Sequence, residues 1–273
     1  MQFSDFDFLD FGCSNGGSIK FAQSMFGGLG LGLDADPRKV ERACAAGYNA
    51  IVQDVTRLDP RTMGTVRYVI MSHFLEHLPS ASLAEKCILS ACKVADEFVF
   101  VQQPYFDADG YLFEHGLKLY WSHWRGHTLH MTMLQLQSAF EKARCEGLCG
   151  RYLIGRRFPI LDSSAKEVHR LSSPIDQVTF DPKKHEDRPN LSFTTPVFRE
   201  LFGLALRHED VNDAALVKIL KNTDIVFDSA STFHPDKVPI LLTSDNRRIN
   251  NYRLLPNYFG SAARRLARLW PWV

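Results

Sequence analysis

Residues 9–17 read Leu-Asp-Phe-Gly-Cys-Ser-Asn-Gly-Gly, and this glycine-rich segment is the strongest indication of fold class in the chain. The apolar and aromatic segment 6–11 predicts a short strand, and residues 18–26 predict a helix that the Gly27-Gly28 pair ends. Glycine allows positive φ angles and close approach of the backbone to other groups. Because the loop opens a helix, its free N–H groups favour negative charge nearby. The stretch therefore predicts a strand–turn–helix unit that binds a ligand.

Outward from this unit, strand and helix patterns alternate along the chain. The segments that read as further strands are 29–34, 50–53, 67–72, 97–103 and 151–158. Helix starts are indicated by Asp36 before Pro37, with Gly47 as the stop, and by capping-box spacing at Ser82/Glu85 and Thr132/Gln135. This alternation predicts an α/β fold with a doubly wound, mainly parallel sheet, in which ligands bind at the carboxyl ends of the strands.

The chain divides into four expected regions. Residues 1–160 form the ligand-binding core, and residues 161–222 form an insertion with a helix at 195–207. Residues 223–245 hold two strands, 225–231 and 238–244, that close the sheet. Residues 246–273 form a basic tail, which we expect to dock on protein rather than to lie as a peripheral helix on anionic lipid.

Composition limits the class of protein. Of the 273 residues, 45% are hydrophobic and 23% are charged, as in ordinary globular proteins. The net charge of +1 argues against a nucleic-acid partner. No window of about 18 apolar residues is present, and the N-terminus lacks the basic region of a signal peptide. The six cysteines form no CxxC pair, which predicts reduced thiols in a cytoplasmic protein.

Three kinds of site could use the glycine loop. Gly12-Cys13-Ser14-Asn15-Gly16 is a formal GxSxG nucleophile elbow, but a hydrolase needs strands upstream of it. A dinucleotide-binding GxGxxG would use Gly12, Ser14 and Gly17, with Asp34 near the usual offset. That motif lacks its middle glycine, which normally lets the backbone approach the pyrophosphate. An NAD-dependent oxidoreductase is therefore one alternative.

The third kind of site is carried by four ordered motifs. Asp10, Gly12 and Gly16 match D-x-G-x-G-x-G at the end of a strand, with Ser14 in place of the middle glycine. Gly32-Leu33-Asp34, Gln53-Asp54-Val55 and Val69–Pro79, which contains Leu-Glu-His-Leu, follow at the next three strands. In this order they resemble the Rossmann-like (class I) S-adenosylmethionine-dependent methyltransferase superfamily. The resemblance covers residues 7–104 and implies a seven-stranded sheet.

The resemblance implies specific roles for strand-end residues. Asp34 would bind the ribose hydroxyls of S-adenosylmethionine, Asp54 the adenine amino group, and Asp10 would lie near the methionine amino group. A structural interpretation competes for each acid: Asp54 could cap a turn, and Asp10 could order the loop. Asp36 we expect only to cap its helix. The predicted cofactor-binding residues are Asp10, Gly12, Cys13, Ser14, Gly16, Asp34, Ala35, Asp54, Val55 and Ser72.

Histidines after the fourth strand are the candidates for proton transfer. His73 is our leading general base, with His77 as second candidate and His123 and His127 as alternates, because histidine titrates near pH 6.5. His73 and His77 lie four residues apart with Glu76 between them, which could suggest a metal. The HExxH order is absent, so we predict no metal.

The activity implied is methyl transfer to an oxygen or nitrogen of a small-molecule or sugar-type acceptor. The aromatic and histidine-rich segment 120–130 could be a lid over the acceptor or a packed loop. A non-catalytic binding protein with the same fold is the competing class, since Ser14 departs from the glycine motif. The sequence predicts neither the acceptor's identity nor an oligomeric state.

Overall fold

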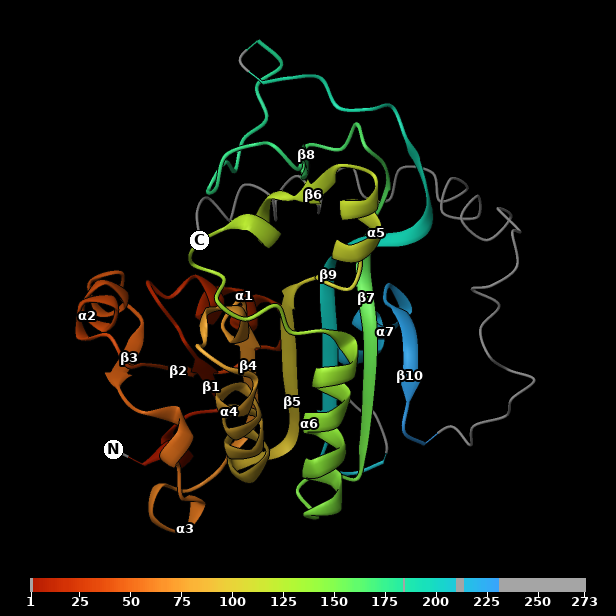
Figure 1. Cartoon of the computed structure of the whole chain (residues 1–273). Helices are drawn as coiled ribbons and strands as arrows, with labels where there is room; N and C mark the ends of the chain where they lie inside the picture. The colour runs from red at the N-terminus through yellow and green to blue at the C-terminus, as the bar shows by residue number, and fades with distance from the viewer. Residues whose placement is uncertain (1, 184, 210–213, 231–273) are drawn as a thin grey trace. The chain divides into compact units, whose positions relative to one another are not determined.

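The computed structural model describes residues 2–183, 185–209 and 214–230, and its centre is one eight-stranded sheet (Figure 1). The strand order is β10-β7-β9-β5-β4-β1-β2-β3. The strands are β1 (Phe8–Phe11), β2 (Gly30–Asp34), β3 (Asn49–Val52), β4 (Val66–Ser72), β5 (Ala95–Pro104), β7 (Arg151–Asp162), β9 (Ser192–Leu206) and β10 (Asp224–Asp228).

The first five strands are parallel and give the sheet its ligand-binding edge. The chain runs outward from β1 through β2 to β3, then returns to the other side of β1 with β4 and β5. The order of the strands thus reverses between β1 and β4, and ligands of doubly wound sheets bind outside the carboxyl ends at such a switch point. The predicted doubly wound, mainly parallel sheet is confirmed.

The far side of the sheet differs from the prediction. β9 pairs antiparallel with both β5 and β7, and β10 is added antiparallel to β7. The sheet therefore has eight strands, not seven. The helix predicted at 195–207 is wrong, and the range 161–222 is not simply an insertion, because β9 lies inside the sheet. Apolar residues over 197–206 fit a helical face and a doubly covered strand equally well, so only the neighbouring strands select between them.

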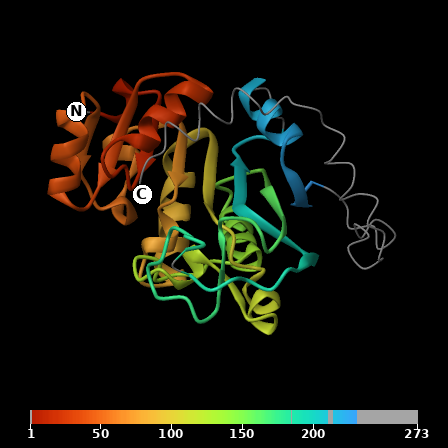
Figure 2. The ribbon, with the colours of Figure 1, turned by 90° about the horizontal axis from the view of Figure 1, so that it is seen from above.

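Two layers of helices cover the sheet. Seen from above, α1 (Gly17–Phe26) and α7 (Ala214–Lys221) lie on one side, and α4 (Ala81–Val94) and α6 (Met133–Cys145) lie on the other (Figure 2). Alternate strand residues serve the two layers, because side chains of a strand point to opposite faces. Phe8, Tyr68 and Phe98 pack with α1 and α7 residues, whereas Leu9 and its counterparts on neighbouring strands pack with α4 and α6.

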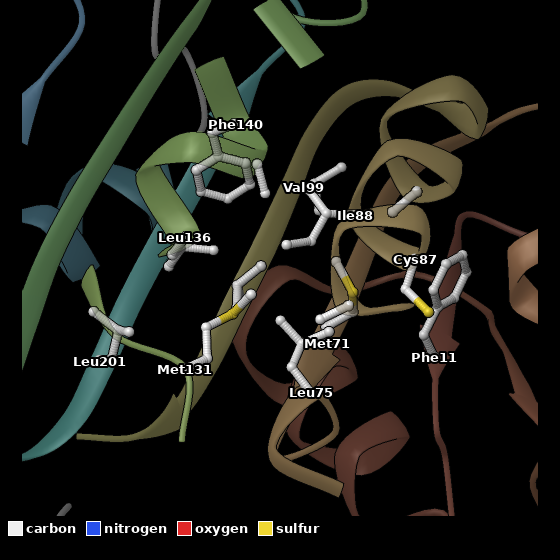
Figure 3. Packing of buried hydrophobic residues seen from close by; sticks show 14 of the residues in the cluster. Phe11, Met71, Leu75, Cys87, Ile88, Val99, Met131, Leu136, Phe140 and Leu201 are labelled. Carbon is white, nitrogen blue, oxygen red and sulfur yellow. The ribbon is translucent and has the colours of Figure 1, made fainter. Parts of the chain in front are cut away.

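The larger of the two cores lies under α4 and α6 (Figure 3). Cys87 and Ile88 of α4 meet Phe11 and Met71 of the sheet, and Leu136 and Phe140 of α6 cover the β9 side. Each of these side chains is at most 1% exposed, so this layer is dry and closely packed. The core therefore holds the carboxyl ends of β1 and β4 rigidly in place.

The helix caps follow sequence rules with one exception. Asp36 accepts the Arg38 N–H at the start of α2 (Pro37–Ala45), and Thr132 with Gln135 forms the capping box of α6, as predicted. The cap predicted at Ser82 is wrong. Ser80 caps α4 instead, accepting the Leu83 N–H, because its extended backbone directs the hydroxyl onto the first turn.

Short elements connect the layers, and those that follow β5 cover the top of the sheet in Figure 1. A two-stranded sheet joins β6 (Leu117–Leu119) to β8 (Val168–Arg170), so segments far apart in sequence meet there. The remaining short elements are η1 (Phe3–Asp5), η2 (Val55–Arg57), α3 (Pro60–Met63), η3 (Leu75–His77), α5 (Asp109–Glu114) and η4 (Tyr120–His123).

The cysteines, the apolarity of the helices and the C-terminal segments were also subjects of prediction. All six cysteines fall in the described ranges, and none of them is paired. Among the described helices, none combines the length and apolarity that crossing a bilayer requires. The strand predicted at 238–244 and the basic tail at 246–273 lie outside the described residues.

Candidate functional site

The loop after β1 adopts the conformation that its glycines permit. Gly12 and Gly16 have φ angles of +75° and +90°, and Ser14 between them also has a positive φ of +49°. Positive φ is uncommon for a residue with a Cβ. Serine therefore takes the place of the motif's middle glycine without changing the left-handed turn, at some cost in local strain.

Aromatic rings pack directly against two glycines of the loop. A Cβ on Gly12 would lie 2.2 Å from the ring of Phe74, and one on Gly16 would lie 2.2 Å from the ring of Tyr48. Phe74 immediately precedes η3, so η3 and the loop approach each other closely. Glycine is required at both positions because any side chain would push these rings away.

Asp34 holds the same loop from the end of β2. Its Oδ2 accepts the Ser14 N–H at 3.1 Å, and its Oδ1 accepts the Asp36 N–H at 2.9 Å. Lys39 Nζ lies 3.9 Å from Oδ2 of Asp34. Asp34 itself is only 8% exposed. Asp34 is therefore a buried carboxylate that faces the glycine loop across the tips of β1 and β2. Ala35, which follows it, is exposed.

Asp10 lies beneath the loop on β1 and is completely buried. Its Oδ2 accepts the hydroxyl of Ser18, while its Oδ1 has no hydrogen-bond partner among the described residues. Burial raises the pKa of Asp10 to about 8, against the lowering effect of the Ser18 hydrogen bond. A cationic ligand group would provide the missing hydrogen-bond donor for Oδ1 and would stabilise the ionised carboxylate.

The other predicted cofactor residues occupy different surroundings. Cys13 is buried against Gly32, and burial raises the pKa of its thiol, so it packs as a small apolar side chain. Asp54 follows β3 and accepts the N–H and hydroxyl of Thr56, so it caps η2, in which Val55 is buried. Ser72 ends β4, and its buried Oγ has no partner among the residues described.

His73 lies at the switch point, directly after β4. It has a positive φ of +51°, and its N–H donates to the Gln102 carbonyl at 2.8 Å. Its Nδ1 is 3.3 Å from Oε1 of the fully buried Glu76. Burial lowers the pKa of His73, but the hydrogen bond and charge of Glu76, with the charge of Glu200, outweigh it, so the pKa is raised above its ordinary value.

A polar network that the sequence analysis missed continues from His73. Gln102 of β5 places its Nε2 3.4 Å from His73 Nε2 and 3.2 Å from Glu200 Oε1. Arg157 of β7 donates to Gln102 Oε1 at 3.3 Å and lies 3.7 Å from Glu200 Oε2. Burial raises the pKa of Glu200, opposed by the charge of Arg157. Glu200 lies within the segment that was wrongly predicted as a helix, so the sequence does not point to it. Gln102 is a polar residue at the end of a buried strand, and this position could have indicated a site residue.

The other three candidate histidines divide into two groups. His77 and His127 lie together, with ring centroids 5.1 Å apart. His123 instead bonds to Lys118 at 2.6 Å, and burial followed by the Lys118 charge lowers the pKa of His123. No histidine hydrogen-bonds to the Ser14 hydroxyl within the described ranges, so the hydrolase interpretation lacks its base.

Comparisons with known proteins find similarity to solved structures only. No protein-family model matches the sequence, and no curated protein matches it. Solved structures with similar folds include magnesium protoporphyrin IX methyltransferase from Synechocystis with bound SAH, at 16% identity over 74% of each chain and a TM-score of 0.45. A SAM-dependent methyltransferase from Archaeoglobus fulgidus is 15% identical over 73% of this chain and 85% of its own, with a TM-score of 0.46. A third, from Methanosarcina mazei, is 14% identical over 74% and 92%, with a TM-score of 0.44.

Proposed function

We propose that the chain is an S-adenosylmethionine-dependent methyltransferase acting on an oxygen or nitrogen of a small-molecule or sugar-type acceptor. One observation carries this proposal. Two buried carboxylates, Asp10 and Asp34, lie at the ends of adjacent strands on either side of a left-handed glycine loop, at the switch point of the sheet. Such carboxylates suit a ligand that bears both a diol and a cationic amine.

The residues present fit this cofactor. The unpartnered Oδ1 of Asp10 is placed to accept from the ammonium of the methionine moiety, which would favour the ionised carboxylate. Asp34 is placed to accept two hydrogen bonds from the ribose diol. The free N–H groups at the start of α1 favour the methionine carboxylate. Asp54 accepts from Thr56 through Oδ1 and its Oδ2 lies 3.3 Å from Arg57 Nε, so the adenine amino group would share Oδ2 with Arg57.

The cofactor supplies a methyl group activated by a sulfonium, and the chain's own residues orient the acceptor and move its proton. Holding the reacting atoms in line accounts for much of the rate in such a displacement. His73 is our proposed general base because it follows β4 at the switch point and Glu76 orients its ring. His77 stays the second candidate, although its Nδ1 already faces the Gly126 carbonyl at 2.7 Å.

The surroundings of His73 favour a polar acceptor. Gln102, Glu200 and Arg157 offer hydrogen-bond donors and acceptors within one connected network beside it. Arg157 Nε is buried without a hydrogen-bond partner among the described residues, and a hydroxyl-rich molecule could satisfy it, whereas a purely apolar acceptor could not. This supports the sugar-type class over a hydrophobic one.

The cofactor assignment is tested by calorimetric titration of S-adenosylhomocysteine (SAH). We expect Asp34→Asn to weaken binding by about 10- to 100-fold, because hydrogen bonds to a charged group contribute about 1.5–3 kcal/mol. Asp36→Asn is the matched control, since this neighbouring acid only caps α2. NAD binding in place of SAH binding would favour the oxidoreductase alternative.

The acid–base part is tested by turnover, measured as SAH production from a panel of hydroxyl and amine acceptors. We expect His73→Ala to reduce the rate by about 10²- to 10⁴-fold, as loss of a general base does. His115→Ala serves as the control because His115 lies in another part of the chain, bonded to the Tyr111 carbonyl. Wild-type turnover in both His73→Ala and His77→Ala would refute a histidine base, and SAH binding without any turnover would favour the non-catalytic alternative.

A further inference from the structure

Three side chains with metal-ligating atoms meet beside the predicted acceptor site. Glu76 and His77 belong to η3, and His127 follows η4, about 50 residues later in the chain. One ligand atom of each lies within 4.8 Å of the others. The spacing along the chain pairs His73 with His77, whereas the fold brings His127 to Glu76 and His77.

Backbone carbonyls hold the two imidazoles in the tautomer that leaves Nε2 free to bind a metal. His77 Nδ1 lies 2.7 Å from the Gly126 carbonyl oxygen, and His127 Nδ1 lies 2.9 Å from the Trp121 carbonyl oxygen. A carbonyl oxygen only accepts, so each Nδ1 carries the proton and each Nε2 keeps its lone pair. Backbone carbonyls fix metal-binding histidines in proteins in this way.

Glu76 provides the second, independent indication. Its side chain is fully buried, and neither carboxylate oxygen accepts an aligned hydrogen bond from a described residue. His73 Nδ1 lies 3.3 Å from Oε1, so this imidazole is an ion-pair partner on one side of the carboxylate. A buried carboxylate with one imidazole beside it and no aligned hydrogen bond is costly, and coordination of a cation would reduce this cost.

We propose that Glu76, His77 and His127 bind a divalent transition-metal ion of the zinc class. Two imidazoles and one carboxylate are the donor set that Zn²⁺ and its neighbours prefer over Mg²⁺ or Ca²⁺, and three protein ligands leave a coordination position open. The ion would clamp residues 120–130 to η3 and bind Glu76, the carboxylate that also orients His73. The site does not depend on which cofactor the glycine loop binds.

The test is a Zn²⁺ titration of the full chain, made without a polyhistidine tag and treated with a chelator. We expect one ion to bind, and His77→Ala to weaken its binding by on the order of 100-fold or more, since even second-shell losses reach that range. His77 is exposed, so this variant should fold, which circular dichroism checks. His127→Gln, at a buried position, provides a second ligand variant, and His115→Ala is the control.

Cobalt distinguishes the proposed ligands from the six thiols. Co²⁺ in the site should quench the fluorescence of Trp124, whose ring lies 4.9 Å from that of His127, and Trp124→Phe should remove this quenching. Equal affinity in wild type and His77→Ala, no binding at all, or sulfur-to-cobalt charge-transfer absorption would each overturn the proposal. SAH binding is measured in a separate titration. A protein that binds zinc but not SAH would contradict only the proposed function, and a protein that binds SAH but not zinc would contradict only the metal site.

Discussion

At the scale of single residues, Asp10 shows how a binding group can oppose stability. Its folded-state pKa is about 8, raised by burial from an ordinary value of 3.8. Between these values the folded state holds a proton that the unfolded state releases. The stability of the ligand-free protein therefore falls as pH rises through this window and levels off above pH 8.

Asp10→Asn removes this ionisation and keeps the shape of the side chain. We expect the free energy of unfolding of the variant, relative to wild type, to increase steadily from pH 4 to pH 8. Urea unfolding at pH 5, 7 and 9 measures it, with Asp7→Asn, an acid outside the site, as control. SAH binding should be lost at the same time, and a pH-independent difference would contradict the assigned pKa.

Ser14 is the second residue whose conformation conflicts with its type. The left-handed conformation destabilises a residue that has a Cβ by about 1–2 kcal/mol. Glycine avoids this strain but loses about 0.5–1 kcal/mol more conformational entropy on folding. We therefore expect Ser14→Gly to stabilise the protein by up to about 1 kcal/mol, measured by the urea midpoint. Gly16→Ala, at φ +90° and against Tyr48, should destabilise it; a destabilised Ser14→Gly would mean that the hydroxyl has a role of its own.

At the scale of elements, β9 depends on a close approach to α6. A Cβ on Gly203 would lie 2.8 Å from both Leu136 and Phe140. We expect Gly203→Ala to destabilise the protein by about 1–3 kcal/mol through overpacking, measured by denaturant unfolding. Gly110→Ala is the matched control: nothing lies within 4 Å of its Cβ, and it should stabilise α5 slightly. Equal effects of the two substitutions would show that β9 is not packed in this way.

At the scale of the whole molecule, SAH binding should raise the thermal stability of the folded protein. SAH at 100 times its Kd would add about 2.7 kcal/mol to the folded state. For a domain of this size that corresponds to a rise in Tm of about 5–10 °C. At the same SAH concentration, Asp34→Asn should show about half of the rise or less in calorimetric scans. An equal rise in wild type and variant would place SAH away from the end of β2.

The parallel half of the sheet and the glycine loop at its edge could be predicted from local sequence patterns. The strands up to Pro104 and the caps at Asp36 and Thr132 depend on local hydrogen bonds and short-range hydrophobic patterns, which a sequence displays directly. Tertiary structure alone decided that residues 192–206 form a strand, because β5 and β7 provide hydrogen-bond partners that a helix would not need. It likewise decided that Glu200 reaches Gln102 and that His127 reaches Glu76, since long-range contacts leave no periodic trace in the sequence.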